Sequence, residues 1–197
     1  QSLWFFDTSD NEAVTRLNRR SFTENMKKER IFELILIMAI MAGAFYAAFS
    51  DVHNFPNRWF TRDDAYYYFK VAQNISEGLG STFDGVNLAN GYHPLWLLVN
   101  IPIFALARFD LVLPLRILIL LTGALQAATA VLLYRLISRV LSQVAGIFVA
   151  SFWAFNLYIH AMVAQFGLET GITAFSIVLF LYTAEKIERK WRGYSKG

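Results

Sequence analysis

The sequence contains no cysteine, which excludes disulfides, thiolate metal sites and cysteine nucleophiles. Charged residues are also scarce: they make up 17% of the chain, whereas soluble domains carry roughly 25%. Hydrophobic residues account for 56% and aromatic residues for 16%. The net charge is only +3, and the basic residues stand in short groups at the ends of apolar runs, which argues against a nucleic-acid partner. The composition therefore predicts an integral membrane protein.

Apolar runs of about 20 residues have the length that a helix needs to cross a bilayer core of roughly 30 Å. We predict membrane spans at about residues 31–50, 111–133 and 144–163, and a shorter one at 171–184. The expected fold class is all-α: a polytopic membrane protein with about four transmembrane helices and additional external juxtamembrane or re-entrant helices.

A fifth apolar run, at about residues 95–107, is short and contains Pro102, which is typical of an interfacial or re-entrant segment. If it does not cross, the basic residues around Arg135 lie on the same side as the basic arm 1–30 and the basic tail 186–197. Cytoplasmic segments carry the excess of Lys and Arg. We therefore predict a multi-pass protein of the cell inner (plasma) membrane with both termini cytoplasmic.

The remaining polar region, residues 51–110, is then an external loop. We expect it to contain interfacial helices at about 64–77 and 95–107, with Asp64 capping the first and Gly78 ending it. One side of the first helix carries an apolar stripe made of Tyr68, Ala72, Ile75 and Leu79.

Four residues able to carry chemistry fall on this external side: Asp63, Asp64, His93 and Glu169. Of the adjacent carboxylates, one can cap a helix while the other acts as a general base or binds a cation, or both can merely solvate the helix start. His93 precedes a proline and can hydrogen-bond at the interface or contact a phosphate. Glu169 either caps the last span or belongs to the site.

The order of these segments resembles the start of the GT-C superfamily of membrane glycosyltransferases. After the first span, Asp-Asp-Ala-Tyr opens an external helix, followed by Glu-Gly-x-Gly and then by Asn-Gly-Tyr-His-Pro-Leu-Trp. The resemblance covers roughly residues 31–185 and is most specific at residues 62–98. This segment is similar to arabinofuranosyl-, aminoarabinose- and mannosyltransferase-like members, which use polyprenyl-phosphate sugars as donors.

The resemblance implies a role for each candidate. The first-loop acid would be Asp63 or Asp64 and would hold or deprotonate the acceptor hydroxyl, with Glu169 as a second external acid. His93 would approach the donor phosphate. Tyr67 and Tyr92 complete the predicted substrate-binding residues. We predict no metal ligand, and a divalent cation is the one cofactor left open. The expected partners are membrane lipid, a polyprenyl-phosphate-linked sugar and other membrane subunits.

Three functions are compared. The first is a glycosyltransferase, and the second is a non-catalytic subunit derived from one and kept in a larger complex. The third, a transporter or channel fragment, ranks last because few ionisable residues lie inside the spans. Because the chain begins with Gln1 rather than Met, we expect it to be trimmed or part of a longer protein.

Overall fold

The computed structural model describes residues 8–194, and among them the side chains of residue 24 and of residues 26–193 except 54, 56 and 57. Within residues 8–194 the regular structure is helical, and an isolated bridge between Thr82 and Leu88 is the nearest approach to a strand. The predicted all-α class is therefore confirmed. The chain divides into two compact units between residues 35 and 36.

The first unit consists of the early part of helix α1 (Thr8–Ala48), which continues into the second unit. The basic arm predicted at residues 1–30 is thus helical from residue 8. The predicted span at 31–50 begins inside this helix rather than at its start, and residues 26–48 are apolar enough to cross a membrane. The helix extends further than the apolar run because polar residues with good helix propensity continue it.

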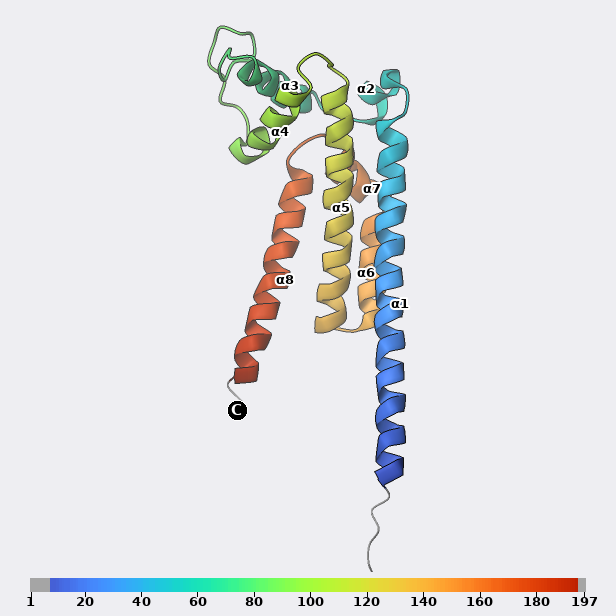
Figure 1. Cartoon of the computed structure of the whole chain (residues 1–197). Coiled ribbons are helices and arrows are strands. Elements are labelled where there is room, and N and C mark those ends of the chain that lie inside the picture. Colours follow the sequence, from blue (N-terminus) through green and yellow to red (C-terminus); the bar gives the residue numbers. More distant parts are fainter. Residues whose placement is uncertain (1–7, 195–197) are drawn as a thin grey trace, which may run out of the picture. The chain divides into compact units, whose positions relative to one another are not determined.

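The second unit holds the rest of the described chain (Figure 1). Its helical elements after α1 are η1 (Val52–Asn54), α2 (Phe55–Arg58), α3 (Asp63–Ser76), α4 (Pro94–Leu106), α5 (Leu113–Val140), α6 (Gln143–Phe155), α7 (Leu157–His160), the π-helical turn η2 (Ala161–Gln165) and α8 (Thr170–Tyr194). The predicted interfacial helices at 64–77 and 95–107 correspond to α3 and α4.

Three described helices are long and apolar enough to cross a membrane: residues 26–48 of α1, all of α5, and residues 170–193 of α8. A fourth crossing is formed if α6 is joined to residues 157–165, across a bend of 56°. The span predicted at 144–163 therefore corresponds to two helical segments with a bend between them. The side chain of Asn156 accepts the N–H groups of Tyr158 and Ile159 at 3.0 and 3.1 Å, which starts a new helix at this point.

Helix α8 continues ten residues past the predicted end of its span at 184. Pairs of opposite charge spaced four residues apart support this extension, since Glu185 lies 2.8 Å from Arg189 and Glu188 pairs with Arg192. Glu185 also lies 3.7 Å from Arg139 of α5. This ion pair therefore joins the C-terminal end of α5 to the C-terminal part of α8, where these basic residues lie.

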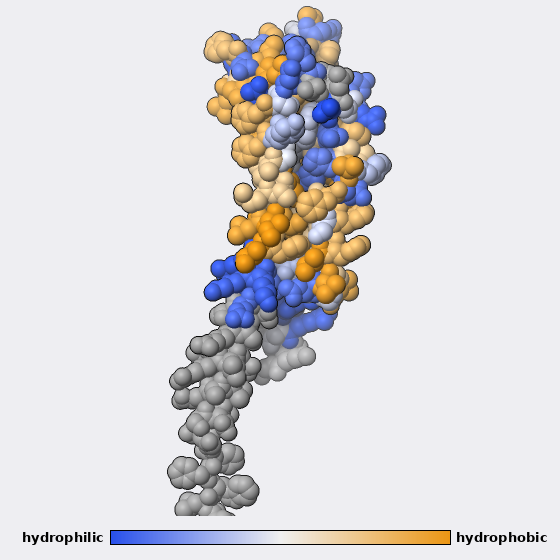
Figure 2. Space-filling model, turned by 90° about the vertical axis from the view of Figure 1, so that its right-hand side faces the viewer, coloured by the Kyte–Doolittle hydropathy of each residue, from blue (hydrophilic) through white to orange (hydrophobic). Residues whose placement is uncertain are grey.

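Small residues allow the long helices to approach closely, as they do in membrane proteins generally. A Cβ atom on Gly123 of α5 would lie only 2.5 Å from the Cβ of Ala44 of α1. A Cβ on Gly146 of α6 would lie 2.0 Å from the Oγ of Ser138 of α5. On the face seen in Figure 2, apolar side chains form a band between more hydrophilic ends of this unit.

Helices α3 and α4 pack against each other near the start of α5 (Figure 1). Their shared core is aromatic: the ring of Phe69 meets Phe60 edge-on at 5.1 Å and stacks with Phe104 at 5.7 Å. Trp96 is 1% exposed in the same core. Buried contacts therefore fix the positions of both helices, and with them the positions of the side chains at the helix ends.

Candidate functional site

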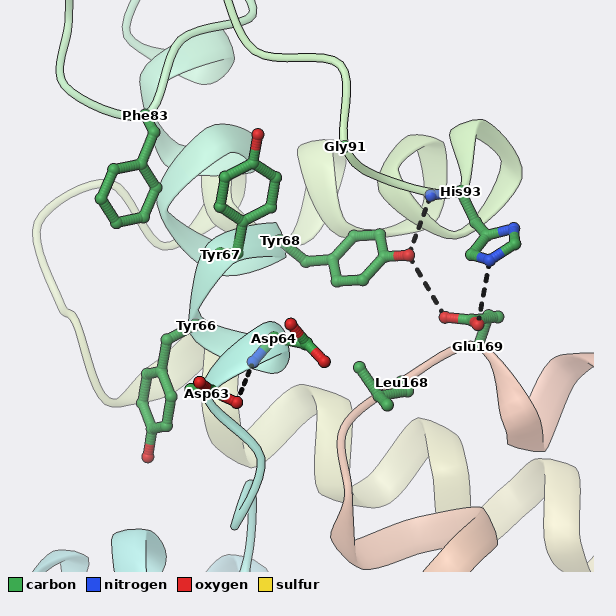
Figure 3. Close-up of a pocket in the computed structure, with 10 residues that line it drawn as sticks. All are labelled: Asp63, Asp64, Tyr66, Tyr67, Tyr68, Phe83, Gly91, His93, Leu168 and Glu169. Carbon is green, nitrogen blue, oxygen red and sulfur yellow. Dashed lines mark hydrogen bonds and ion pairs between the residues drawn. The ribbon is translucent and has the colours of Figure 1, made fainter.

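A cavity of about 820 Å³ opens beside the start of α3 (Figure 3). Its lining comes from α3, from the loop before α4 and from the loop before α8. The lining residues are Asp63, Asp64, Tyr66, Tyr67, Tyr68, Phe83, Gly91, His93, Leu168 and Glu169. A volume of this size lies within the range of about 300–1,000 Å³ that is usual for small-molecule sites.

The two carboxylates lie in the first turn of α3, where the positive end of the helix dipole favours negative charge. The helix begins at Asp63 and its N-cap is Arg62, so the prediction that Asp64 caps it is wrong. The backbone N–H of Asp64 instead donates to Oδ1 of Asp63 at 3.1 Å. The side chain of Asp64 extends towards Tyr68 and Glu169, whereas that of Asp63 lies nearer Tyr66 (Figure 3).

The far end of α3 fixes the loop that forms one cavity wall. Gly78 has a φ of +86°, and its N–H donates to the carbonyl of Ile75 while that of Leu79 donates to Asn74, which is a Schellman ending. The predicted stop at Gly78 is confirmed. The buried amide of Asn74 donates to the carbonyls of Thr82 and Phe83 at 3.0 and 3.1 Å.

This loop carries Phe83 into the lining, where its ring stacks on Tyr67 with centroids 5.3 Å apart. The next turn is stabilised by Asp84, whose carboxylate accepts hydrogen bonds from the backbone and side-chain amides of Asn87 and from the N–H of Val86. These bonds, those from Asn87 first, lower the pKa of Asp84 to about 2. The stacked rings of Tyr67 and Phe83, which we call the aromatic wall, are therefore supported by an ordered turn.

The centre of the site is a ring of interactions among Tyr68, His93 and Glu169 (Figure 3). The backbone N–H of His93 donates to the phenolic oxygen of Tyr68 at 2.8 Å. That phenol donates to Oε2 of Glu169 at 3.2 Å, and Oε1 of Glu169 lies 3.3 Å from Nε2 of His93. Three segments that are distant in the sequence are thereby joined at one point.

The environment keeps Tyr68 in its protonated form. Burial raises the pKa of its phenol, the negative charges of Glu169 and Asp64 raise it further, and the hydrogen bond from His93 opposes them. Only 4% of Tyr68 is exposed. The phenol is therefore a donor to Glu169, which leaves the carboxylate oriented towards the cavity.

The loop before α8 is held so that Glu169 reaches this ring. The indole N–H of Trp96 donates to the carbonyl of Gly167 at 3.2 Å, and Gly167 adopts a φ of +71°. The guanidinium of Arg62 lies 4.5 Å from the ring centre of Phe166. Of the two roles predicted for Glu169, its backbone carbonyl begins α8 by accepting from Thr173, while its side chain belongs to the cavity.

Five of the six predicted site residues line this single cavity: Asp63, Asp64, Tyr67, His93 and Glu169. Tyr92 does not, because its hydroxyl lies 2.5 Å from the Oγ of Ser81, and its role in substrate binding stays a prediction. Sequence reasoning did not assign Tyr68 to the site. Tyr68 belongs to the apolar stripe of α3, but its position four residues after Asp64 also puts both residues on one helix face.

The lining of the cavity includes three carboxyl groups and one imidazole, and neither Lys nor Arg is among the described residues that line it. Such a lining can accept hydrogen bonds and protons from hydroxyl groups, while the aromatic wall can cover an apolar face of a ligand. Among the described residues there is no group of three or more His, Asp and Glu side chains that could hold a metal ion. The divalent cation stays a prediction.

Comparisons of the chain with protein-family models, with curated proteins and with solved structures gave no match. The resemblance to membrane glycosyltransferases therefore stays a prediction that rests on the residues quoted for it. By itself, the chain shows a polytopic helical membrane protein with an acidic and aromatic cavity at the end of its long helices.

Proposed function

We propose that this chain is the sugar-transferring module of a membrane glycosyltransferase that uses a polyprenyl-phosphate-linked sugar as donor. The observation that carries the proposal is the meeting of Asp64, His93 and Glu169, from three separate segments, in one cavity. That cavity lies next to candidate membrane spans, where the reactive end of a lipid-linked substrate would be found.

In the proposed reaction, the acceptor is a hydroxyl compound bound in the acidic cavity. Asp64 takes the proton of the acceptor hydroxyl as its oxygen attacks the anomeric carbon of the donor sugar. The bond from that carbon to the phosphate oxygen breaks, and polyprenyl phosphate leaves with the electron pair. Glu169 holds a second hydroxyl, and His93, whose side chain is 71% exposed, contacts the departing phosphate from the rim.

The aromatic wall suits a sugar ring. The rings of Tyr67 and Phe83 are stacked on each other, and the side chain of Tyr66, which also lines the cavity, is 40% exposed. Aromatic faces cover the apolar faces of ligands, while the carboxylates nearby accept bonds from hydroxyl groups. A neutral polyhydroxylated ring satisfies both surfaces at once, whereas a free anion would be repelled by the carboxylates.

We further propose that the cavity faces the extracytoplasmic side of the plasma membrane. The basic residues Arg139, Arg189 and Arg192 lie together at the ends of α5 and α8. The segments that line the cavity, which are α3 and the loops before α4 and α8, are near the opposite ends of those helices, beside the starts of α5 and α8 (Figure 1). Because cytoplasmic segments carry the excess of Lys and Arg, the basic end would be cytoplasmic.

The test is a transfer assay on the purified protein in nanodiscs. Polyprenyl phosphates carrying radiolabelled mannose or arabinose are supplied, and the release of polyprenyl phosphate is followed. Asp64→Asn is expected to lower the rate by about 10²–10⁴-fold, the usual contribution of a general base. Asp63→Asn and Glu169→Gln, which alter binding, are expected to have smaller effects.

Glu77→Gln is the matched control, since Glu77 follows the same helix but bonds to Gln73 and lies outside the cavity. It should retain the wild-type rate. If Asp64→Asn, Asp63→Asn and Glu169→Gln all released polyprenyl phosphate as fast as the wild type, the proposed function would be abandoned.

A second candidate function is that of a non-catalytic subunit of a larger membrane complex. It is favoured by α8, because only 11% of the most apolar stretch of this helix is buried and side chains such as Phe180 and Leu181 are exposed. This surface could contact another subunit as well as lipid. Cross-linking from position 180 in native membranes tests it: a single protein adduct in fixed stoichiometry would support this function, and adducts to lipid alone would count against it.

A further inference from the structure

A second cavity, of about 410 Å³, lies at the end of α1 and is called the α1 groove below. Its polar and small lining residues are Gly43, Tyr46, Ser50, Arg58, Thr61 and Gln165. The segments that line it continue into the lining of the acidic cavity, since Asp63 lies shortly after Thr61 and Glu169 shortly after Gln165 in the chain. The backbone joins these two segments, since the N–H of Thr61 lies 3.4 Å from the carbonyl oxygen of Gln165.

The charge of the α1 groove is opposite to that of the acidic cavity. Arg58 is exposed, and no carboxylate is among the described residues that line the groove. The structure gives its guanidinium no ion pair with a described residue. The nearest carboxylates along the chain are Asp63 and Asp51, and each accepts a backbone N–H, from Asp64 and from His53 respectively. The guanidinium is thus available to an anion, and its planar donor fork matches the oxygens of a phosphate.

Hydrogen-bond donors accompany this charge. Tyr46 and Thr61 carry hydroxyl groups, and the side chain of Gln165 carries an amide. The hydroxyl of Ser50 instead donates its proton to the carbonyl of Ala47 at 2.8 Å, so it is not a donor to a ligand. An anion with several oxygens can therefore be bound by one cation and by neutral donors.

The groove opens on an apolar surface. Tyr46 is 81% exposed on α1, and Phe45 and Phe49 next to it are 49% and 65% exposed with their rings stacked. Phe45 and Tyr46 lie at the end of the part of α1 that is apolar enough to cross a membrane, and Phe49 follows that part directly. Exposed aromatic residues at the end of a span typically lie at the level of the lipid head groups. A ligand of the groove would therefore have its anionic part beside Arg58 and its apolar part along α1.

We propose that the α1 groove binds the phosphate head group of an anionic membrane lipid, with Arg58 as its principal contact and the acyl chains along α1. This site differs from the acidic cavity in charge and lining, and it does not depend on the proposed glycosyl transfer. Since Thr61 and Gln165 line the groove, a lipid there would contact the two segments that carry Asp64 and Glu169.

The test uses the whole chain in a neutral detergent with equal amounts of phosphatidylglycerol and phosphatidylcholine. Native mass spectrometry counts the lipids retained. One phosphatidylglycerol is expected to be retained in preference to phosphatidylcholine. Arg58→Gln should weaken its binding about tenfold, the loss of one charge-assisted bond. Arg58→Lys should keep part of the affinity, and Lys70→Gln, an exposed cation of α3 outside both cavities, should leave it unchanged.

A second variant tests the groove without removing its charge. A Cβ on Gly43 would meet no atom within 4 Å, so Gly43→Leu can be accommodated and would occupy the groove. It should lower phosphatidylglycerol retention with unchanged helicity by circular dichroism. Equal retention of the two lipids, retention unaffected by both Arg58→Gln and Gly43→Leu, or complete displacement by millimolar inorganic phosphate would each overturn the proposal. The transfer assay is read separately, so either idea can fail alone.

Discussion

The phenolic oxygen of Tyr68 lies 3.2 Å from Oε2 of Glu169, although 101 residues separate them in the chain. The same oxygen accepts the backbone N–H of His93 at 2.8 Å. One hydroxyl group therefore sets the relative positions of α3, the start of α4 and the loop before α8.

Removing this hydroxyl should loosen the site without unfolding the protein. Tyr68→Phe deletes one donor and one acceptor, and we expect a loss of about 1 kcal/mol in unfolding free energy and about tenfold in polyprenyl phosphate release. Tyr66→Phe is the control, because Tyr66 lines the same cavity from the same helix but is 40% exposed. Equal behaviour of the two variants would show that the ring of Tyr68, His93 and Glu169 does not position the site.

The raised pKa of Tyr68 predicts a pH dependence at the alkaline end. Burial, aided by the charges of Glu169 and Asp64, holds the folded pKa above the ordinary 10.0, so the unfolded chain loses this proton first as pH rises. The stabilisation is complete below about pH 10 and is lost as the pH rises through the folded pKa. Ultraviolet titration at 295 nm, taken as wild type minus Tyr68→Phe, should show a midpoint above 10; a midpoint at or below 10 would contradict the assignment.

Gly167 is predicted to be irreplaceable for two separable reasons. Its φ of +71° is unfavourable for other residues, and a Cβ would lie 2.5 Å from a ring carbon of Phe60 and 3.0 Å from the Cβ of Ala65. Gly80 has the same φ of +71° but open space around it. We expect Gly80→Ala to cost about 1 kcal/mol and Gly167→Ala about 1–3 kcal/mol more, by SDS-induced unfolding. Equal losses of unfolding free energy in the two variants would mean that the ring of Phe60 moves away from the added Cβ at no cost.

The bend between α6 and α7 should depend on Asn156. Its side-chain oxygen accepts two backbone N–H groups, and Asn156→Ala should lower the unfolding free energy by about 1 kcal/mol. Ser142→Ala removes a single cap bond at the exposed start of α6 and should cost less. The order of the two losses, measured by the same unfolding method, is the check. A larger loss from Ser142→Ala would show that the cap of Asn156 does not hold the bend.

Much of the fold could be predicted because it depends on local patterns. Apolar runs indicated where α1, α5, α6 with α7, and α8 lie, since span length follows from bilayer thickness. Gly78 indicated where α3 ends. The helices differ from the predicted spans at two places where a local signal was not recognised. Asn156 interrupts a run that remains apolar on both sides, and α8 continues through a charged segment supported by pairs such as Glu185 with Arg189.

The candidate site could be predicted only in part. Asp63, Asp64, His93 and Glu169 were expected on one side of the membrane, because topology alone assigns residues to a side. Topology does not give distances, and it could not separate Tyr67, which lines the cavity, from Tyr92, which bonds to Ser81.

By itself, the sequence determined that this is a helical membrane protein, roughly where its long helices run, and which acidic residues share one side. Those properties follow from hydrophobic length, charge and helical periodicity, which act over neighbouring residues. The tertiary structure alone decided that Tyr68 joins His93 to Glu169 and that Arg58 faces a groove of its own. These arrangements depend on packing between segments such as α3 and the loop before α8, and no local pattern encodes how such distant segments meet.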